Sequence, residues 1–323
     1  MYRHSSYVYW PLLALIALLS IISVFNLYGT TGPYVSKVYI NQVYWLVLGS
    51  VCMYCVTRMD DHLIRRMIPI FYITVIILLI LVLLIGKKVN GSQRWLDLKY
   101  FAFQPSELAK VAVILMLAHW FQNNARPEGY NIVDLMPVIL ILALPMFLIF
   151  REPDLGHTLI IALIALSMFA CEKFTRKTVV GCVLSVICAF PFIWSFVLKK
   201  YQKERILTLI DHRVDRLGAG WHAYQSEIAV GSGGFLGKGH LKGTQVAGRF
   251  LPENHTDFVF AKFSEEHGFL GASVVLAIYC GIILCALYTA YTGKDRFASH
   301  VAVGVAAFIF WQVIMNVGMV LNL

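Results

Sequence analysis

Asp257 is the side chain best suited to acid–base chemistry, because it is a carboxylate set between polar residues and a run of aromatic ones. An aspartate is ionised near neutral pH unless it is strongly desolvated, so Asp257 can take a proton from an attacking hydroxyl group. A structural alternative is that Thr256 or Asp257 caps a short helix whose apolar face, from Phe258 to Phe263, lies on a membrane surface. A metal site begun by His255 and Asp257 lacks further ligands at a recognisable spacing.

Glu107 and Lys110 form a second candidate, at the start of an apolar run that follows Pro105. Side chains three residues apart lie on one helix face and can pair. The structural alternative is a carboxylate at a helix start and a lysine that extends to the membrane interface. Because an unpaired charge at bilayer depth costs about 2.5 to 3.5 kcal/mol on insertion scales, charges placed there are functional candidates. We predict an ion pair that shapes a cavity, not a pair of reacting groups.

Cationic side chains are the third candidate. Arg205 lies close to several lysines, and Arg94 follows a polar turn that begins at Asn90. Such a cluster commonly anchors a protein to lipid headgroups. Alternatively, the planar guanidinium group suits a clamp for a diphosphate leaving group.

The overall composition indicates which kind of fold holds these residues in place. The chain has 323 residues, 59% of them hydrophobic and 14% charged, with a mean hydropathy of +0.71. That is more apolar surface than one water-soluble core hides. The apolar runs are long enough to cross about 30 Å of hydrocarbon as helices, in which each backbone group finds a partner inside its own segment. We therefore predict an all-α, polytopic transmembrane helical bundle.

The predicted organisation has three parts. Residues 1–198 contain seven transmembrane helices, residues 199–267 form one large extracytoplasmic loop, and residues 268–323 contain two more helices. The first helix shows no small-residue cleavage site, so we expect it to be retained as an anchor. The nine predicted spans are approximately 10–27, 43–57, 67–85, 107–121, 135–150, 158–171, 179–198, 269–291 and 299–321.

The short links predict the orientation. With a cytoplasmic N-terminus, the inner links carry ten cations: Arg3, Arg58, Arg65, Arg66, Arg126, Lys173, Arg176, Lys177, Lys294 and Arg296. The outer links carry six: Lys37, Lys87, Lys88, Arg94, Lys99 and Arg151. Because cytoplasmic links are enriched in Lys and Arg, this difference places the long loop outside the cell membrane.

An outward site excludes several classes of chemistry. Nucleotides are normally absent there, so the substrate should arrive activated on its own carrier. The stretch Gly231–Gly239 resembles a phosphate-binding loop but has Ser232 and Gly239 where that motif needs Gly and Ser or Thr, which argues against an ATPase. The net charge of +9 is dispersed over the links, which argues against nucleic acid. The seven cysteines lie in or beside apolar runs, which argues against disulfides.

Several short motifs follow one another in an order that resembles a known family. These are Asn90–Leu96, Gln104–Lys110, Glu152–Gly156, Leu217–His222, Gly231–Gly234, Gly237–Gly239, Gly243–Gln245 and Leu251–Phe258. Together they resemble the SEDS family (shape, elongation, division and sporulation) of bacterial cell-wall proteins, and its elongation branch in particular. The resemblance extends over essentially the whole chain.

The resemblance implies a peptidoglycan glycosyltransferase of the bacterial cytoplasmic (inner) membrane. Such an enzyme polymerises lipid II, a disaccharide-pentapeptide on undecaprenyl diphosphate, at the outer face of the cytoplasmic membrane. Asp257 matches the family's essential aspartate, a general base for the acceptor hydroxyl, and Glu107 and Lys110 match its intramembrane pair. Further motif positions are expected to bind substrate: Arg94, Asp154, Gln202 and Arg205.

The resemblance also implies a class B penicillin-binding protein as the partner and ten transmembrane helices, of which nine are predicted here. Glu152 stands where the family more usually has Gln. No cofactor is required by the sequence, and a divalent cation is compatible with it. Two other functions fit the same features: a flippase for lipid-linked precursors, since many spans with an internal charge pair suit a transporter, and a non-catalytic scaffold for the transpeptidase.

Overall fold

The computed structural model describes residues 6–28, 35–89, 92–97, 102–192, 194–195, 203, 221–248 and 256–321. Two of the predicted site residues, Gln202 and Arg205, lie outside these ranges. The chain divides into two units. Unit 1 comprises 1–58, 189–282 and 312–323, and unit 2 comprises 59–188 and 283–311.

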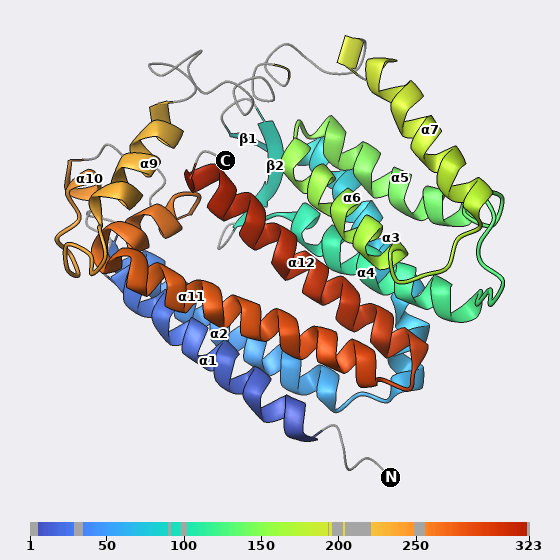
Figure 1. Ribbon diagram of the computed structural model, residues 1–323, viewed down its shortest axis with the longest axis horizontal. Helices are drawn as coiled ribbons and strands as arrows, with labels where there is room; N and C mark the ends of the chain where they lie inside the picture. Colours follow the sequence, from blue (N-terminus) through green and yellow to red (C-terminus); the bar gives the residue numbers. More distant parts are fainter. Residues whose placement is uncertain are drawn as a thin grey trace. The chain divides into compact units, whose positions relative to one another are not determined.

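Unit 2 is built on four helices that pack against one another (Figure 1): α3 (Asp61–Ile85), α4 (Pro105–Asn123), α5 (Met136–Arg151) and α6 (Leu155–Phe169). α7 (Arg176–Phe192) begins in this unit. The core consists of fully buried aliphatic side chains, among them Leu79, Leu117, Ile149, Ile161 and Ile164. Such apolar faces pair because close packing supplies many small dispersion contacts.

The starts of α4 and α6 have clear local causes. Pro105 is the first residue of α4, where its fixed φ suits a helix and its missing N–H costs nothing. Asp154 is the N-cap of α6, and its Oδ1 accepts a hydrogen bond from the backbone N–H of His157 at 3.3 Å. Both helix starts therefore bring predicted site residues to the same end of unit 2.

A small antiparallel sheet joins α3 to α4. Its strands are β1 (Lys87–Val89), β2 (Ser92–Asp97) and β3 (Ala102–Phe103), in the order β1-β2-β3. Lys87 is paired with Trp95, and Leu96 with Phe103. The all-α prediction is right for the bundle but omitted this sheet, because the strands are too short to show an alternating pattern. The sheet fixes the backbone that carries Arg94.

The first part of α12 (Arg296–Leu321) completes unit 2. A Cβ atom added at Gly304 would overlap Ile114 of α4 and lie 3.1 Å from Sδ of Met168 in α6. Trp311 donates a hydrogen bond from Nε1 to Oγ of Ser167 at 2.9 Å. α12 therefore approaches α4 and α6 closely at a residue without a side chain, as small residues allow in membrane bundles.

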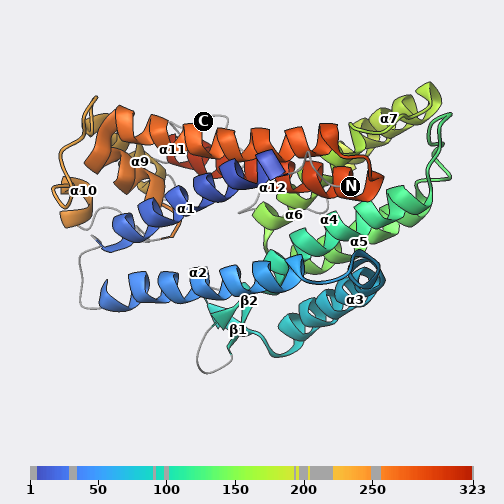
Figure 2. The same cartoon turned by 90° about the horizontal axis from the view of Figure 1, so that it is seen from below.

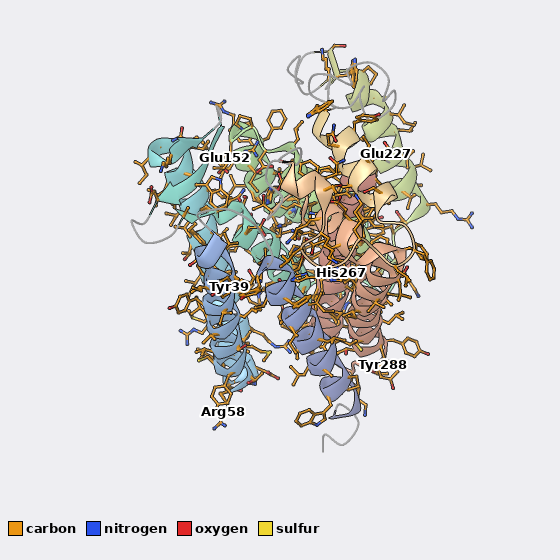
Figure 3. The ribbon with its side chains drawn as sticks, turned by 90° about the vertical axis from the view of Figure 1, so that its left-hand side faces the viewer. Tyr39, Arg58, Glu152, Glu227, His267 and Tyr288 are labelled. Atoms are coloured by element: carbon orange, nitrogen blue, oxygen red, sulfur yellow. The ribbon has the colours of Figure 1, made fainter. Side chains whose placement is uncertain are left out.

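Unit 1 contains α1 (Ser6–Tyr28) and α2 (Val35–Thr57), which run antiparallel (Figure 2). Tyr39 and Arg58 mark the two ends of α2 in Figure 3. α11 (Val259–Thr292) packs on α1 within this unit, with Gly281 facing Leu15. α9 (Trp221–Ser232) and α10 (Thr244–Ala247) belong to the predicted outer loop.

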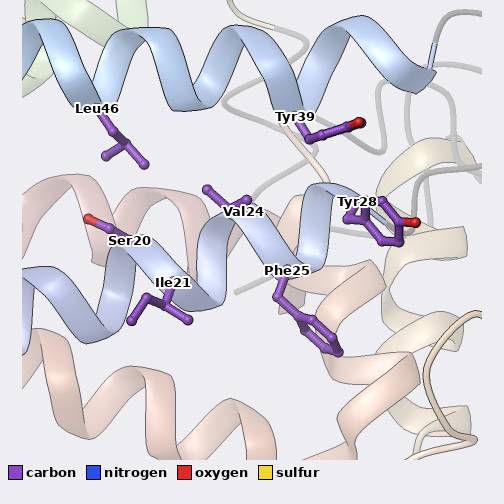
Figure 4. A pocket seen from close by; sticks show the side chains of 7 residues that line it. All are labelled: Ser20, Ile21, Val24, Phe25, Tyr28, Tyr39 and Leu46. Carbon is purple, nitrogen blue, oxygen red and sulfur yellow. The ribbon is translucent and has the colours of Figure 1, made fainter.

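A groove of about 500 Å³ lies on unit 1 between α1 and α2 (Figure 4). Its lining is apolar apart from a few hydroxyl groups, and it includes Val24, Phe25, Tyr28, Tyr39 and Leu46. It contains no acidic or basic side chain, so we assign no chemistry to it.

Each of the nine predicted spans overlaps one helix among α1 to α7, α11 and α12. By length and composition, five of these helices can cross a membrane: α1 from Trp10, α2 from Val38, α3, α11 and α12. α5 and α6 are shorter apolar helices. The prediction of an all-α polytopic membrane protein is therefore confirmed.

α11 begins ten residues before the predicted span from 269, because Val259–His267 is also helical. Gly268 interrupts the helix with φ 66° and ψ −165°. Figure 3 shows His267 beside this interruption and Tyr288 farther along the same helix. Gly237 also has positive φ, and a Cβ atom at either glycine would overlap the backbone of the other segment. Glycine is therefore needed at both positions for this close approach.

Candidate functional site

Arg94 and Asp154 meet at the end of unit 2 where α4 and α6 begin. Nε of Arg94 is 3.6 Å from Oδ2 of Asp154, and the guanidinium group also donates to the backbone carbonyls of Glu152 (3.3 Å) and Pro153. Asp154 is 6% exposed and Arg94 30%. Arg94 thus holds the turn between α5 and α6 against the sheet, while part of its side chain stays exposed at the protein surface.

Glu107 and Lys110 form the ion pair that their spacing predicted, with Oε2 and Nζ 2.9 Å apart. Lys110 is fully buried and Glu107 is 47% exposed. The Lys110 ammonium also faces the ring of Phe308 at 5.0 Å. Lys110 is therefore a buried cation whose charge is balanced by Glu107, the exposed member of the pair.

His157 joins these two pairs. Its Nε2 is 2.7 Å from Oε1 of Glu107, and its Nδ1 is 2.9 Å from Oδ2 of Asp154. We did not predict a role for His157 from the sequence. The signal was the three-residue spacing of Asp154 and His157, which puts both on the first turn of α6.

Glu152 is the second residue whose role the sequence did not specify. It is fully buried, and in the described part of the chain neither carboxyl oxygen has a hydrogen-bond partner. Burial, and then the charge of Asp154, raise the pKa of Glu152 to about 8, against the opposing charges of Arg94 and His157. Glu152 is therefore a neutral acid at neutral pH, which explains how it can replace an amide.

Asp154 shifts in the other direction. Burial alone would raise its pKa, but the hydrogen bonds and charge of His157, together with the charge of Arg94, hold the pKa of Asp154 below its ordinary value. Two carboxyl groups two residues apart thus have opposite protonation states at neutral pH. Environments that separate the pKa values of neighbouring acids are characteristic of functional sites.

Asp257 lies in unit 1, two residues before α11, and is exposed. Among the described residues, its carboxylate has no hydrogen-bond or ion-pair partner, so it is accessible to a substrate hydroxyl. The alternative in which Phe258 and Phe263 lie on a membrane surface is wrong, because they are 9% and 8% exposed. Phe258 packs with Ala229 and Ala261, since this segment is covered by the loop.

The loop is clamped to α11 by Glu265, which is fully buried. Its Oε1 accepts hydrogen bonds from Nζ of Lys238 (2.7 Å), from the backbone N–H groups of Thr244 (2.7 Å) and Gln245 (3.1 Å), and from Oγ1 of Thr244 (3.0 Å). Lys238 also donates to the hydroxyls of Ser232 and Thr244. The lysine of the apparent phosphate-binding loop is therefore occupied by structural contacts.

The family model described as "Cell cycle protein", FTSW_RODA_SPOVE, matches residues 3–323 of the chain. The chain belongs to the FtsW/RodA/SpoVE family. This match covers nearly the whole length, and it includes every residue that we selected from the sequence.

Two curated relatives match most of this chain and about three quarters or more of their own length. "Peptidoglycan glycosyltransferase MrdB" of Escherichia coli is 37% identical over 85% of this chain and 74% of its own length. "Peptidoglycan glycosyltransferase RodA" of Treponema pallidum is 29% identical, over 90% of this chain and 83% of its own.

Two solved structures share the fold of this FtsW/RodA/SpoVE member. One belongs to work described as "Structural coordination of polymerization and crosslinking by a peptidoglycan synthase complex", with a TM-score of 0.82 and 25% identity, covering 97% of this chain and 87% of that one. The other is RodA of Thermus thermophilus, with a TM-score of 0.67 and 22% identity, covering 96% and 84%. The chain is thus a multi-pass membrane protein of this family.

Proposed function

We propose that the chain is a peptidoglycan glycosyltransferase that polymerises lipid II into glycan strands during cell elongation. The observation that carries this proposal is the 37% identity, over 85% of the chain, to a protein named for that activity. The exposed Asp257 and the charged cluster of unit 2 supply the residue types that the reaction needs.

In the proposed reaction, the acceptor sugar's hydroxyl attacks the anomeric carbon of the lipid-linked donor. Asp257 takes the hydroxyl proton as general base, a new glycosidic bond forms, and the bond to the diphosphate breaks. The electron pair of that bond leaves on the diphosphate, whose charge Arg94 and Arg205 stabilise. The substrate brings its own leaving group, so no nucleotide is consumed.

Lys110 and Glu107 are proposed to shape the substrate site, together with Asp154 and Gln202. The supporting observation is that the fully buried Lys110 forms an ion pair at 2.9 Å with the half-exposed Glu107 carboxylate. A desolvated ammonium attracts an anionic or hydroxyl-bearing group strongly, since few water molecules compete for it. No cofactor is assigned to the protein. A divalent cation enters the proposal only as an ion bound to the diphosphate of the substrate, whose charge it neutralises.

The proposed location is the bacterial cytoplasmic (inner) membrane, with the N-terminus in the cytoplasm and residues 199–267 outside. Ionic contacts within unit 2 support this sidedness. Arg65 pairs with Asp295 at 2.5 Å, and Arg296 pairs with Glu172 at 2.6 Å, so links predicted to be inner contact one another. Arg94 contacts Asp154 from another predicted outer link. The proposed partner is a class B penicillin-binding protein.

The test is polymerisation of purified lipid II by the protein in lipid nanodiscs, with and without a class B transpeptidase. The parent should form glycan chains and Asp257→Asn should not. Asp60→Asn is the matched control, because Asp60 is exposed and makes no side-chain cap hydrogen bond. Polymerisation by Asp257→Asn at the parent rate would remove the assigned role of Asp257.

A second assay separates the alternatives. Lipid II flipping is measured in vesicles that contain the protein alone. Flipping without polymerisation would favour the transporter, and neither activity in the presence of the transpeptidase would favour the scaffold. Polymerisation without flipping is the result that we expect.

A further inference from the structure

His157 lies between two carboxylates. Its ring nitrogens are 2.7 Å from Oε1 of Glu107 and 2.9 Å from Oδ2 of Asp154. A neutral imidazole has one N–H donor and one bare nitrogen, and a bare nitrogen this close to an ionised carboxylate is repelled by it. Only the doubly protonated ring donates to both neighbours. The geometry therefore specifies an imidazolium ion at His157.

This ion completes a chain of alternating charges. The order is Arg94 (+), Asp154 (−), His157 (+), Glu107 (−) and Lys110 (+), with successive contacts of 3.6, 2.9, 2.7 and 2.9 Å. The chain leads from β2, through the first turn of α6, to the buried interior of α4. Among the described residues, the middle cation is the side chain that joins the Arg94 pair to the Lys110 pair.

Removal of the middle charge has a clear consequence. Glu107 is 47% exposed, so once Oε1 loses His157 it turns toward water, and the ion pair between Oε2 and Lys110 is left to hold the carboxylate alone. Lys110 is fully buried, and among the described residues Glu107 is its one ion-pair partner. Any displacement of the carboxylate therefore leaves the ammonium less compensated, which is costly at low dielectric.

We propose that His157 is a positioning residue that, as an imidazolium ion, holds the Glu107 carboxylate beside Lys110 and couples this pair to Asp154. The inference rests on the proposed polymerase activity, in which Glu107 and Lys110 shape the substrate site. His157 itself acts through Glu107 and does not touch the reacting atoms.

The first experiment compares substitutions at position 157 in the nanodisc polymerisation assay. His157→Gln keeps a polar side chain of similar reach but no charge, and it should lower kcat/KM at least about tenfold, the scale of a lost hydrogen bond to a charged group. His157→Arg keeps a cation that can donate to two carboxylates, and it should recover the rate to within about threefold. His62→Gln is the matched control, since His62 is exposed.

A double-mutant cycle tests whether His157 acts through Glu107. On a Glu107→Gln background, His157→Gln should cost little more, because the carboxylate that it positions is already gone. An equal loss on both backgrounds would overturn the proposal. Size-exclusion chromatography and thermal unfolding of each variant establish that a low rate does not come from misfolding.

The second experiment is independent of activity. The protein is labelled with ¹⁵N-histidine, and the ring resonances of His157 are assigned by their absence from His157→Gln. Two protonated nitrogens at pH 7.5 are expected, and one bare nitrogen would overturn the proposal. If the parent does not polymerise lipid II, the proposed function fails, while these spectra still decide the state of His157.

Discussion

Lys238 and Glu265 are 27 residues apart in the sequence, yet Nζ of the first lies 2.7 Å from Oε1 of the second. This pair fastens the glycine-rich turn 231–248 to the part of α11 that follows Asp257. Removal of one partner of a buried ion pair leaves the other charge uncompensated, which typically costs about 3 to 5 kcal/mol.

Lys238→Met is therefore expected to destabilise the loop. The cost should be about 3 kcal/mol, the lower end of that range, because Lys238 is 26% exposed and water screens part of the lost interaction. Hydrogen exchange in nanodiscs should show faster exchange of the backbone amides in 231–248. Lys242→Met is the control, because Lys242 is exposed on the same turn. Unchanged protection in Lys238→Met would contradict the clamp.

Glu152→Gln is expected to change how stability depends on pH. The pKa of Glu152 is raised from 4.5 to about 8 by burial and then by Asp154, so the folded state holds a proton that the unfolded state releases. Its contribution is complete below pH 4.5 and is lost as the pH rises toward 8, at about 1.4 kcal/mol per pKa unit. The parent should therefore lose more stability between pH 5 and about pH 8.5 than the Gln variant.

Thermal unfolding in detergent at several pH values measures this difference. Glu128→Gln, at an exposed site, should leave the pH dependence unchanged. Parallel curves for the parent and Glu152→Gln would show that Glu152 is ionised in the folded protein.

Asp154→Asn should retain the helix cap but lose the charge between Arg94 and His157. Asparagine caps a helix as well as aspartate does, so the expected loss of about 1.5 to 3 kcal/mol comes from the charged hydrogen bonds. The pKa of Asp154 is lowered in the folded state, so this stabilisation is present above its ordinary value of 3.8 and disappears as the pH falls below it.

Unfolding by sodium dodecyl sulfate in mixed micelles at pH 7 and about pH 3, on either side of the ordinary pKa of 3.8, checks this expectation. Asp97→Asn is the control, because the Lys87–Asp97 pair is exposed and should contribute less than about 1 kcal/mol. The deficit of Asp154→Asn should be smaller at the acid pH, and a deficit that grows there would contradict the direction assigned to the pKa of Asp154.

Gly304→Ala is expected to lower stability by about 1 to 3 kcal/mol, because its Cβ atom would overlap Ile114 in a packed core. Ile114→Ala in the same chain should restore part of the loss. Gly49→Ala has open space around it and should be neutral or stabilising, since alanine favours helix. Equal unfolding temperatures for Gly304→Ala and Gly49→Ala would show that α12 does not approach α4 at this residue.

The nine helices α1 to α7, α11 and α12 could be predicted because each is strongly apolar, a signal that depends on composition and not on neighbours. The short helices α9 and α10 were not predicted. The Glu107–Lys110 pair could also be predicted from local sequence, because residues three apart lie on one face of a helix. Contacts between distant segments could not. The Arg94–Asp154 pair depends on how β2 meets the α5–α6 turn, and the burial of Phe258 depends on the loop that covers it. His157 was missed because its two partners come from different helices.

Gly268 has a consequence for how α11 is anchored. Backbone hydrogen bonds join the turn 231–248 to α11 on both sides of this kink: two N–H groups of the turn donate to Glu265 and Glu266, and the N–H groups of Phe269 and Leu270 donate back to the turn. The turn therefore braces the kink like a fixed elbow. A tilt of the long half of α11 is passed on to the segment that begins at Val259, and the two halves of the helix move together.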